Sequence, residues 1–162
     1  AKAHCPVMTV RANTAKIGYE DILVPIDSSS HTRQKIVPTL KFAEKFGSKI
    51  HLLGLLGKHE ANYKHNLEVI LGQIEKMAEK HGLECVSKIL ENVTQPGAQT
   101  MKHAYKIKAD LISIMSDQKA GGGTALLGGY AHEVLNDSKI PVLCFKPEVH
   151  AEMAPFSIGG MW

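Results

Sequence analysis

Short apolar runs alternate along this chain with segments that repeat apolar residues at helical spacing. The apolar runs lie at 21–26, 49–56, 84–90, 110–115 and 141–145. Strands that are apolar throughout are typical of a parallel sheet covered by helices on both faces. Because crossovers between parallel strands are right-handed, the pattern predicts an α/β fold with a doubly wound, Rossmann-like, five-stranded parallel sheet. Ligands of such folds bind beyond the carboxyl ends of the strands.

Four segments with helical periodicity separate the apolar runs. The first ends at Gly47 and contains Pro38, which we expect to bend the helix. An apolar stripe over 67–78 predicts the second helix, and Pro96 begins the third. The fourth follows a glycine-rich loop at 121–129. A glycine loop that leads into a helix is a place where α/β proteins hold phosphate, because backbone N–H groups and the helix dipole favour anions.

Composition excludes several classes of function. The 162 residues suffice for one domain, and the formal net charge of +3 comes without a basic stripe that interleaves with aromatic residues. We therefore expect no nucleic acid partner. No apolar run reaches the roughly 20 residues of a membrane helix, and no signal peptide is recognisable, so we expect no membrane contact. The three cysteines form no Cys-x-x-Cys pair and the nine histidines lack the spacing of metal ligands. The sequence predicts a cytoplasmic protein without a metal.

The two ends of the chain lie outside the alternating pattern. Residues 5–11 read Cys-Pro-Val-Met-Thr-Val-Arg and echo residues 140–146, which read Ile-Pro-Val-Leu-Cys-Phe-Lys. We interpret residues 1–11 as the last strand of a preceding copy of the same domain, with a chance likeness of two short β-runs as the alternative. The tail at 148–162 is apolar. Such a tail is expected either to pack on the domain or to cover a partner surface.

Five segments carry a resemblance to a known family. They read Ile-Leu-Val-Pro-Ile-Asp-Ser-Ser (22–29), Ala-Asp-Leu-Ile (109–112), Leu-Leu-Gly-Gly (126–129), Ala-His-Glu-Val (131–134) and Ile-Pro-Val-Leu (140–143). The domain at 19–147 that contains them resembles the universal stress protein family, and looks most like the C-terminal half of a tandem member. The resemblance implies the strand order 3-2-1-4-5 and pairing of fifth strands, either in a homodimer or in a pseudo-dimer with the other tandem half. The implied interface consists of Pro141, Val142, Leu143, Cys144 and Phe145.

The resemblance also implies a pocket that has lost part of its nucleotide signature. Nucleotide-binding members carry one glycine after the fourth strand, a second three residues later and a third ten residues further on, followed by serine or threonine. With Gly128 as the third glycine, Met115 and Gln118 stand at the first two positions and Gly129 stands in place of the hydroxyl residue. The degenerate pocket implied in this way is formed by Pro25, Ile26, Asp27, Met115, Gln118, Gly128 and Gly129.

Bulk at the glycine positions has a physical consequence, because glycine lets the backbone approach a ribose or a phosphate closely. Met115 and Gln118 would fill that space, and loss of the hydroxyl at position 129 removes one phosphate hydrogen bond. Asp27 matches the aspartate that contacts the base or ribose in the family, but a helix cap is the alternative role. The run at 121–123 is either a flexible surface loop or an anion nest.

Three functions remain open at this point. The first is a non-catalytic stress-response protein that acts through dimerisation or association and needs no cofactor. The second is a stress-response switch that binds ATP or AMP, with at most slow hydrolysis. The third is an adenine-nucleotide-dependent transferase of a related fold, for which the sequence offers no acid, base or nucleophile.

Overall fold

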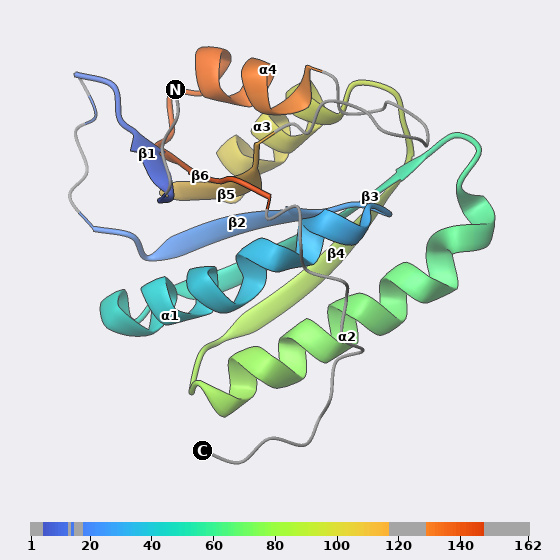
Figure 1. The fold of residues 1–162 in the computed structure, drawn as a ribbon, viewed down its shortest axis with the longest axis horizontal. Coiled ribbons are helices and arrows are strands. Elements are labelled where there is room, and N and C mark those ends of the chain that lie inside the picture. Colours follow the sequence, from blue (N-terminus) through green and yellow to red (C-terminus); the bar gives the residue numbers. More distant parts are fainter. Residues whose placement is uncertain (1–4, 13, 15–17, 117–128, 148–162) are drawn as a thin grey trace.

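The computed structural model describes residues 5–12, 14, 18–116 and 129–147 of the chain. These residues form one mixed sheet with helices on both faces (Figure 1). The sheet has six strands in the order β1-β6-β5-β2-β3-β4. Their bounds are Val7–Thr9 for β1, Asp21–Ile26 for β2, Lys49–Gly57 for β3, Cys85–Val93 for β4, Leu111–Met115 for β5 and Val142–Phe145 for β6.

The predicted α/β fold is confirmed, but the sheet has one more strand than predicted. From β2 onward all neighbouring strands run parallel, in the order β4-β3-β2-β5-β6. The sixth strand, β1, pairs with β6 in the antiparallel direction. A purely parallel five-stranded sheet is therefore wrong, because residues 7–9 add to the open edge of β6 within the same chain.

The helices lie in two layers. In Figure 1, α1 and α2 cover one face of the sheet, while α3 and α4 cover the other. A 3₁₀ helix, η1, leads directly into α1, and a second one, η2, leads into α2. The bounds are Ser30–Lys35 for η1, Ile36–Phe46 for α1, Ala61–Tyr63 for η2, Lys64–Lys80 for α2, Pro96–Lys106 for α3 and Tyr130–Asp137 for α4.

The first helix differs in one respect from its prediction. It ends at Gly47 as expected, and this glycine has the left-handed backbone (φ 63°) that favours glycine. Pro38, however, is only the third residue of α1. A backbone N–H in the first turn has no partner within the helix, so proline removes no hydrogen bond there and no bend is required.

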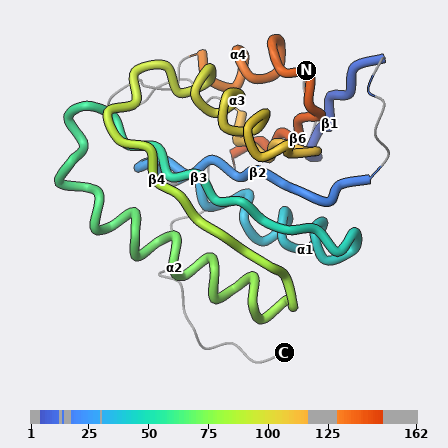
Figure 2. The backbone as a smooth tube through the Cα atoms, turned by 180° about the vertical axis from the view of Figure 1, so that it is seen from behind, coloured from blue at the N-terminus to red at the C-terminus, as the bar shows by residue number. Residues whose placement is uncertain are grey.

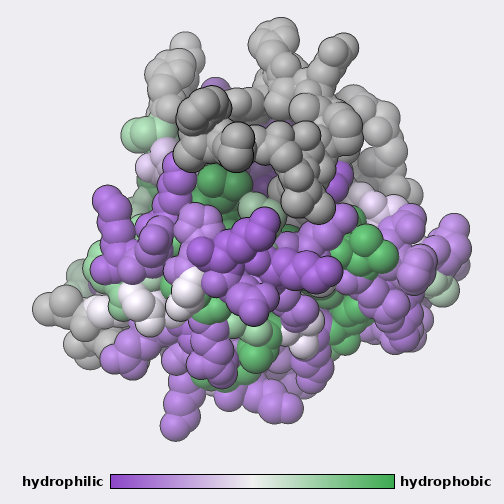
Figure 3. All heavy atoms as spheres, turned by 90° about the horizontal axis from the view of Figure 1, so that it is seen from below, coloured by the Kyte–Doolittle hydropathy of each residue, from purple (hydrophilic) through white to green (hydrophobic). Residues whose placement is uncertain are grey.

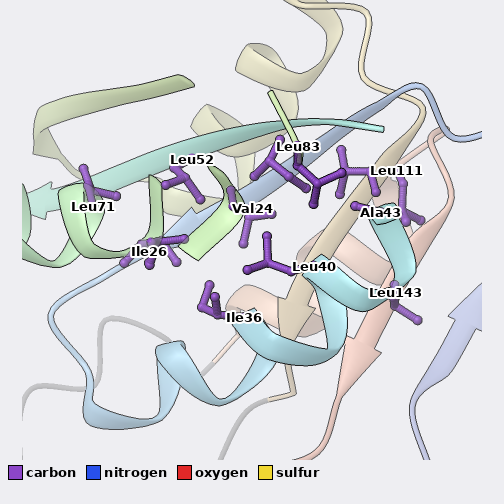
Figure 4. Close-up of a cluster of buried hydrophobic side chains, with 14 of the residues drawn as sticks. Val24, Ile26, Ile36, Leu40, Ala43, Leu52, Leu71, Leu83, Leu111 and Leu143 are labelled. Atoms are coloured by element: carbon purple, nitrogen blue, oxygen red, sulfur yellow. The ribbon is translucent and has the colours of Figure 1, made fainter. Parts of the chain in front are cut away.

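Two apolar clusters hold the layers together. One lies between the sheet and the layer of α1 and α2, where Ile36 and Leu40 of α1 point toward Val24 and Ile26 of β2 (Figure 4). The other lies between the sheet and the layer of α3 and α4. In the face seen in Figure 3, the described surface is mostly hydrophilic with small apolar areas. Within the described residues, no helix combines the length and the apolar character needed to cross a bilayer.

Candidate functional site at the carboxyl ends of β2 and β5

The sheet opens where the strand order changes direction. Strands β2 and β5 pair at Ile22–Leu111 and Leu23–Ile112, three residues short of the carboxyl end of each strand. At this end, η1 packs against β5. Open α/β sheets bind ligands at such a switch point. The candidate site is therefore the crevice between the ends of β2 and β5, with η1 beside it.

Asp27 follows β2 directly and is bound within a local turn. One oxygen of its carboxylate, Oδ1, accepts hydrogen bonds from the backbone N–H of Ser29 at 2.9 Å and from the Ser29 hydroxyl at 2.6 Å. The backbone N–H of Asp27 donates to Thr32 Oγ1 at 3.4 Å. Ser29 is the residue before η1, and its own side chain makes no capping hydrogen bond. Asp27 thus orders the turn that leads into η1.

Lys35, the last residue of η1, brings a buried charge to this crevice. Its side chain is 2% exposed, and Nζ donates to the carbonyl oxygen of Thr32 at 2.8 Å and to Thr32 Oγ1 at 3.0 Å. Burial lowers the pKa of Lys35 to about 8, although the negative charge of Asp27 acts in the opposite direction. An ammonium group therefore lies inside the protein, where the charge of Asp27 acts on it.

A second carboxylate lies at the carboxyl ends of the strands, and both of its oxygens accept hydrogen bonds. Glu60, in the loop after β3, accepts a hydrogen bond from the Ser28 hydroxyl at 2.7 Å through Oε1. Its Oε2 accepts one from the backbone N–H of Gly57, also at 2.7 Å. These bonds tie the carboxyl end of β2 to that of β3. Both carboxylate oxygens of Glu60 are thus used to order the loops that follow β2 and β3.

The structure brings part of the predicted pocket together. Pro25 and Ile26 are buried at the end of β2, and Met115 ends β5, where its half-buried side chain packs against the cluster beneath α1. Gly129 precedes α4 with φ −147°, a backbone that any residue adopts, and no atom lies within 4 Å of a Cβ built on it. Gln118 and Gly128 lie outside the described residues, as do the loop at 121–128 and the tail.

Val142, Leu143 and Cys144, three residues of the predicted interface, pair with β1 of the same chain. Pro141 precedes β6, and its carbonyl oxygen accepts a hydrogen bond from Ile112. Phe145 ends β6 and is buried. In this structure β1 of the same chain occupies the edge of β6 that was predicted to pair with the fifth strand of another copy or tandem half.

Sequence reasoning missed Lys35 and Thr32. The signal was present, because Thr32, Lys35 and the buried Thr39 recur at intervals of three and four residues.

In the part of the chain that the structure describes, no group of three or more histidine, cysteine, aspartate or glutamate side chains is placed to hold a metal ion.

The fold and the crevice define an α/β protein of the doubly wound class, with one added antiparallel edge strand. The family model described as the universal stress protein family matches residues 18–146, and the chain belongs to this family. A universal stress protein of Methanocaldococcus jannaschii is 26% identical over 142 residues, which cover 79% of this chain and 82% of that protein.

Two solved structures from Archaeoglobus fulgidus share the fold. One universal stress protein superposes with a TM-score of 0.66 at 20% identity, over 88% of this chain and 50% of that one. A second, described as a complex with dAMP, superposes with a TM-score of 0.60 at 17% identity, over 79% of this chain and 98% of that one. At these identities the likeness shows the fold alone.

Proposed function

We propose that this domain is a non-catalytic stress-response protein that acts by association, and that its own side chains fill the crevice between β2 and β5. The observation that carries the proposal is the buried ammonium of Lys35, which is 2% exposed and bonded to Thr32. A nucleotide at this crevice would have to displace a side chain that already has its partners. The pocket is therefore filled from within.

The groups around Lys35 support the same conclusion. Oδ1 of Asp27 already accepts two hydrogen bonds from Ser29, so a ribose hydroxyl or an adenine amine would compete with a local turn for it. The thioether of Met115 packs on the core at the end of β5, where close approach of a sugar needs bare backbone. In this proposal the carboxylates at the strand ends order loops and take no part in chemistry.

A second function, binding of an AMP-like nucleotide, is favoured by two observations. One solved relative is a complex with dAMP, and this chain keeps an aspartate after β2. A protonated Lys35 would also attract a phosphate, provided that its ammonium turned away from Thr32. This function requires the crevice to open, whereas the first requires it to stay closed.

Calorimetric titration with AMP and with ATP separates the two functions. We expect no heat of binding from the wild type up to millimolar nucleotide. We expect measurable binding from the double variant Lys35→Ala and Met115→Gly, because it removes the ammonium and clears the end of β5. A variant with the exposed Lys41→Ala is the matched control and should behave as the wild type does.

Two results would contradict the proposal. Micromolar binding to the wild type would show that the crevice is open and would favour the nucleotide switch. A well-folded double variant that binds no nucleotide would show that these two side chains are not what excludes it. Nucleotide hydrolysis by the wild type, followed by phosphate release, would overturn the non-catalytic role.

A further inference from the structure

The sheet has a second edge, formed by β4, and within the described residues no strand pairs with its outer side. β4 runs along the border of the sheet remote from β1 (Figures 1 and 2). It spans nine residues, of which Val93 alone is buried. A long edge strand presents a row of N–H and C=O groups to which another strand can pair. The edge of β4 is therefore the part of the sheet to which a partner has access.

The register with β3 shows which backbone groups of β4 point outward. Ile50 lies opposite Cys85, and its N–H donates to the carbonyl oxygen of Glu84 at 2.8 Å. In a parallel ladder, residues that bond one neighbour alternate with residues whose N–H and C=O groups point the other way. The groups of Cys85, Ser87 and Ile89 therefore point away from β3, where an added strand would meet them.

Side chains of β4 alternate between the two faces of the sheet. Leu90 packs with the cluster on the side of α3 and α4, whereas Ile89 packs with the cluster on the side of α1 and α2. Because successive side chains of a strand point to opposite faces, Val86 and Lys88 share the face of Leu90. Val86 is 41% exposed, and Lys88 is exposed as well. On the side of α3 the edge thus presents a lysine between two apolar residues.

Positive charges gather beside this edge. Burial lowers the pKa of His103 in α3, and the charges of Lys88, His51 and Lys106 lower it further, so all three act on one half-buried imidazole. Asp21, a carboxylate on the same face, is already bound to His51 Nε2 at 2.7 Å through Oδ1. Among the described residues no carboxylate pairs with Lys88 or Lys106. The charge on this side of β4 is therefore not balanced within the domain.

The opposite face of the edge is balanced. There Glu91 of β4 pairs with Lys64 of α2 at 2.6 Å. This difference between the faces disfavours a second copy as the partner. Two copies joined edge to edge around a two-fold axis would continue each face into the same face of the other copy. The two sets of Lys88, His103 and Lys106 would then lie side by side, and like charges across neighbouring strands are destabilising.

We propose that the edge of β4 binds an extended segment of another protein that carries acidic side chains at every second position. The segment adds to β4 as a further strand and pairs with the outward backbone groups of Ser87 and Ile89. Its acidic side chains lie on the side of α3, beside Lys88 and His103, and the side chains between them lie on the side of Ile89. The inference rests on the proposed function, which holds that the domain acts by association, and it names the chemistry of the partner.

A short labelled peptide tests the proposal on the full-length chain. The probe is fluorescein-labelled Thr-Glu-Val-Glu-Val-Glu-Thr with blocked ends, and fluorescence anisotropy measures its binding. We expect the wild type to bind it, and to bind a peptide with lysine in place of each glutamate at least about tenfold more weakly. A peptide of the same composition with its three glutamates adjacent should also bind about tenfold more weakly, because they cannot all lie on one face of a strand.

Two variants separate the charge from the strand pairing. Lys88→Glu should weaken binding of the glutamate peptide about tenfold and strengthen binding of the lysine peptide, while Lys41→Glu, on α1, is the control and should leave both unchanged. Ser87→Pro removes one outward N–H and should weaken binding about tenfold, while Ser87→Ala should not. Proline is tolerated on an edge strand where its nitrogen faces solvent. If Ser87→Pro does not fold, the comparison of Lys88→Glu with Lys41→Glu decides.

Several results would overturn the inference. A wild type that does not bind the glutamate peptide at millimolar concentration has no such site. Equal binding of the alternating and the adjacent glutamate peptides would show that charge alone attracts them, as it would any polyanion. A wild type that forms dimers, and loses them in Ser87→Pro, would show that the edge takes a second copy. Failure of the proposed function shows separately, in the nucleotide titration.

Discussion

Replacement of Lys35 by methionine should change how the stability of the domain depends on pH. The side chain keeps a similar length but loses its charge. In the folded protein burial lowers the pKa of Lys35 from 10.5 to about 8, whereas the unfolded chain keeps the proton up to about 10.5. Between these two values the unfolded state binds more protons than the folded state. The free energy of unfolding of the wild type therefore rises with pH in this window.

The pKa values set the size of this effect. A drop from 10.5 to about 8 corresponds to about 3 kcal/mol, since one pH unit is worth about 1.4 kcal/mol. This stability is missing below pH 8 and is fully present above pH 10.5. Over the practical range from pH 7 to 9.5 we expect the contribution of Lys35 to rise by about 2 kcal/mol. The side chain is 2% exposed, so screening by solvent is small.

Urea unfolding of the wild type and of Lys35→Met across this pH range measures the effect. Other titrating groups are common to both proteins, so they cancel in the difference between the two free energies. That difference should shift by about 2 kcal/mol toward the wild type as the pH rises. Lys41→Met is the control, because the exposed ammonium of Lys41 keeps most of its hydration in the folded state. If the difference in unfolding free energy between the wild type and Lys35→Met does not change with pH, the reasoning that the ammonium of Lys35 is desolvated and closes the crevice is refuted.

Three other substitutions and one alkylation reaction test the packing. Gly54→Ala should lower the free energy of unfolding by about 1–3 kcal/mol, because a Cβ there would lie 2.9 Å from a leucine of α2 and 3.0 Å from an isoleucine of β4. Gly72→Ala should raise the free energy of unfolding by about 0.5–1 kcal/mol, because a Cβ at this position of α2 lies in open space. Urea unfolding measures both changes. Thr39→Val should cost about 1–3 kcal/mol in the same assay, because it leaves the buried hydroxyl of Ser113 without its partner at 2.7 Å. Burial raises the pKa of Cys85 to about 12, so its alkylation at pH 8, followed by mass spectrometry, should be far slower than that of an exposed cysteine; rapid modification of the folded protein would contradict this.

The layered fold was predictable because burial on both faces leaves a clear mark on sequence. Central strands such as β2 are apolar at nearly every position, and α2 carries an unbroken apolar stripe. The edge strand β4 was harder to delimit, since it is mostly exposed and runs to Val93, three residues beyond the predicted end. The strand character of residues 7–9 was visible, but sequence alone did not show whether they would join this sheet.

The candidate site was less predictable for a reason that concerns helix geometry. Lysine is almost never fully buried unless it is paired, so the spacing of Thr32, Lys35 and Thr39 was not enough to place Lys35 inside. The residues before Ile36 form a 3₁₀ helix and not an extension of α1. In a 3₁₀ helix residues three apart are eclipsed, which places Thr32 directly in line with Lys35. An α-helical reading of the same segment does not single out this pair.

The crevice and the covered edge lie on opposite sides of β5 and are joined by one ladder. β5 pairs with β2 on one side and with β6 on the other, and Met115 lies opposite Phe145. Beyond the strand, the backbone N–H of Ser116 donates to the carbonyl oxygen of Phe145 at 2.7 Å. Any movement of Met115 that admitted a ligand would therefore be transmitted to Phe145 in β6. β1 covers the edge of β6, and in the proposed function Lys35 closes the crevice, so that groups of the chain itself would occupy both ends of this path.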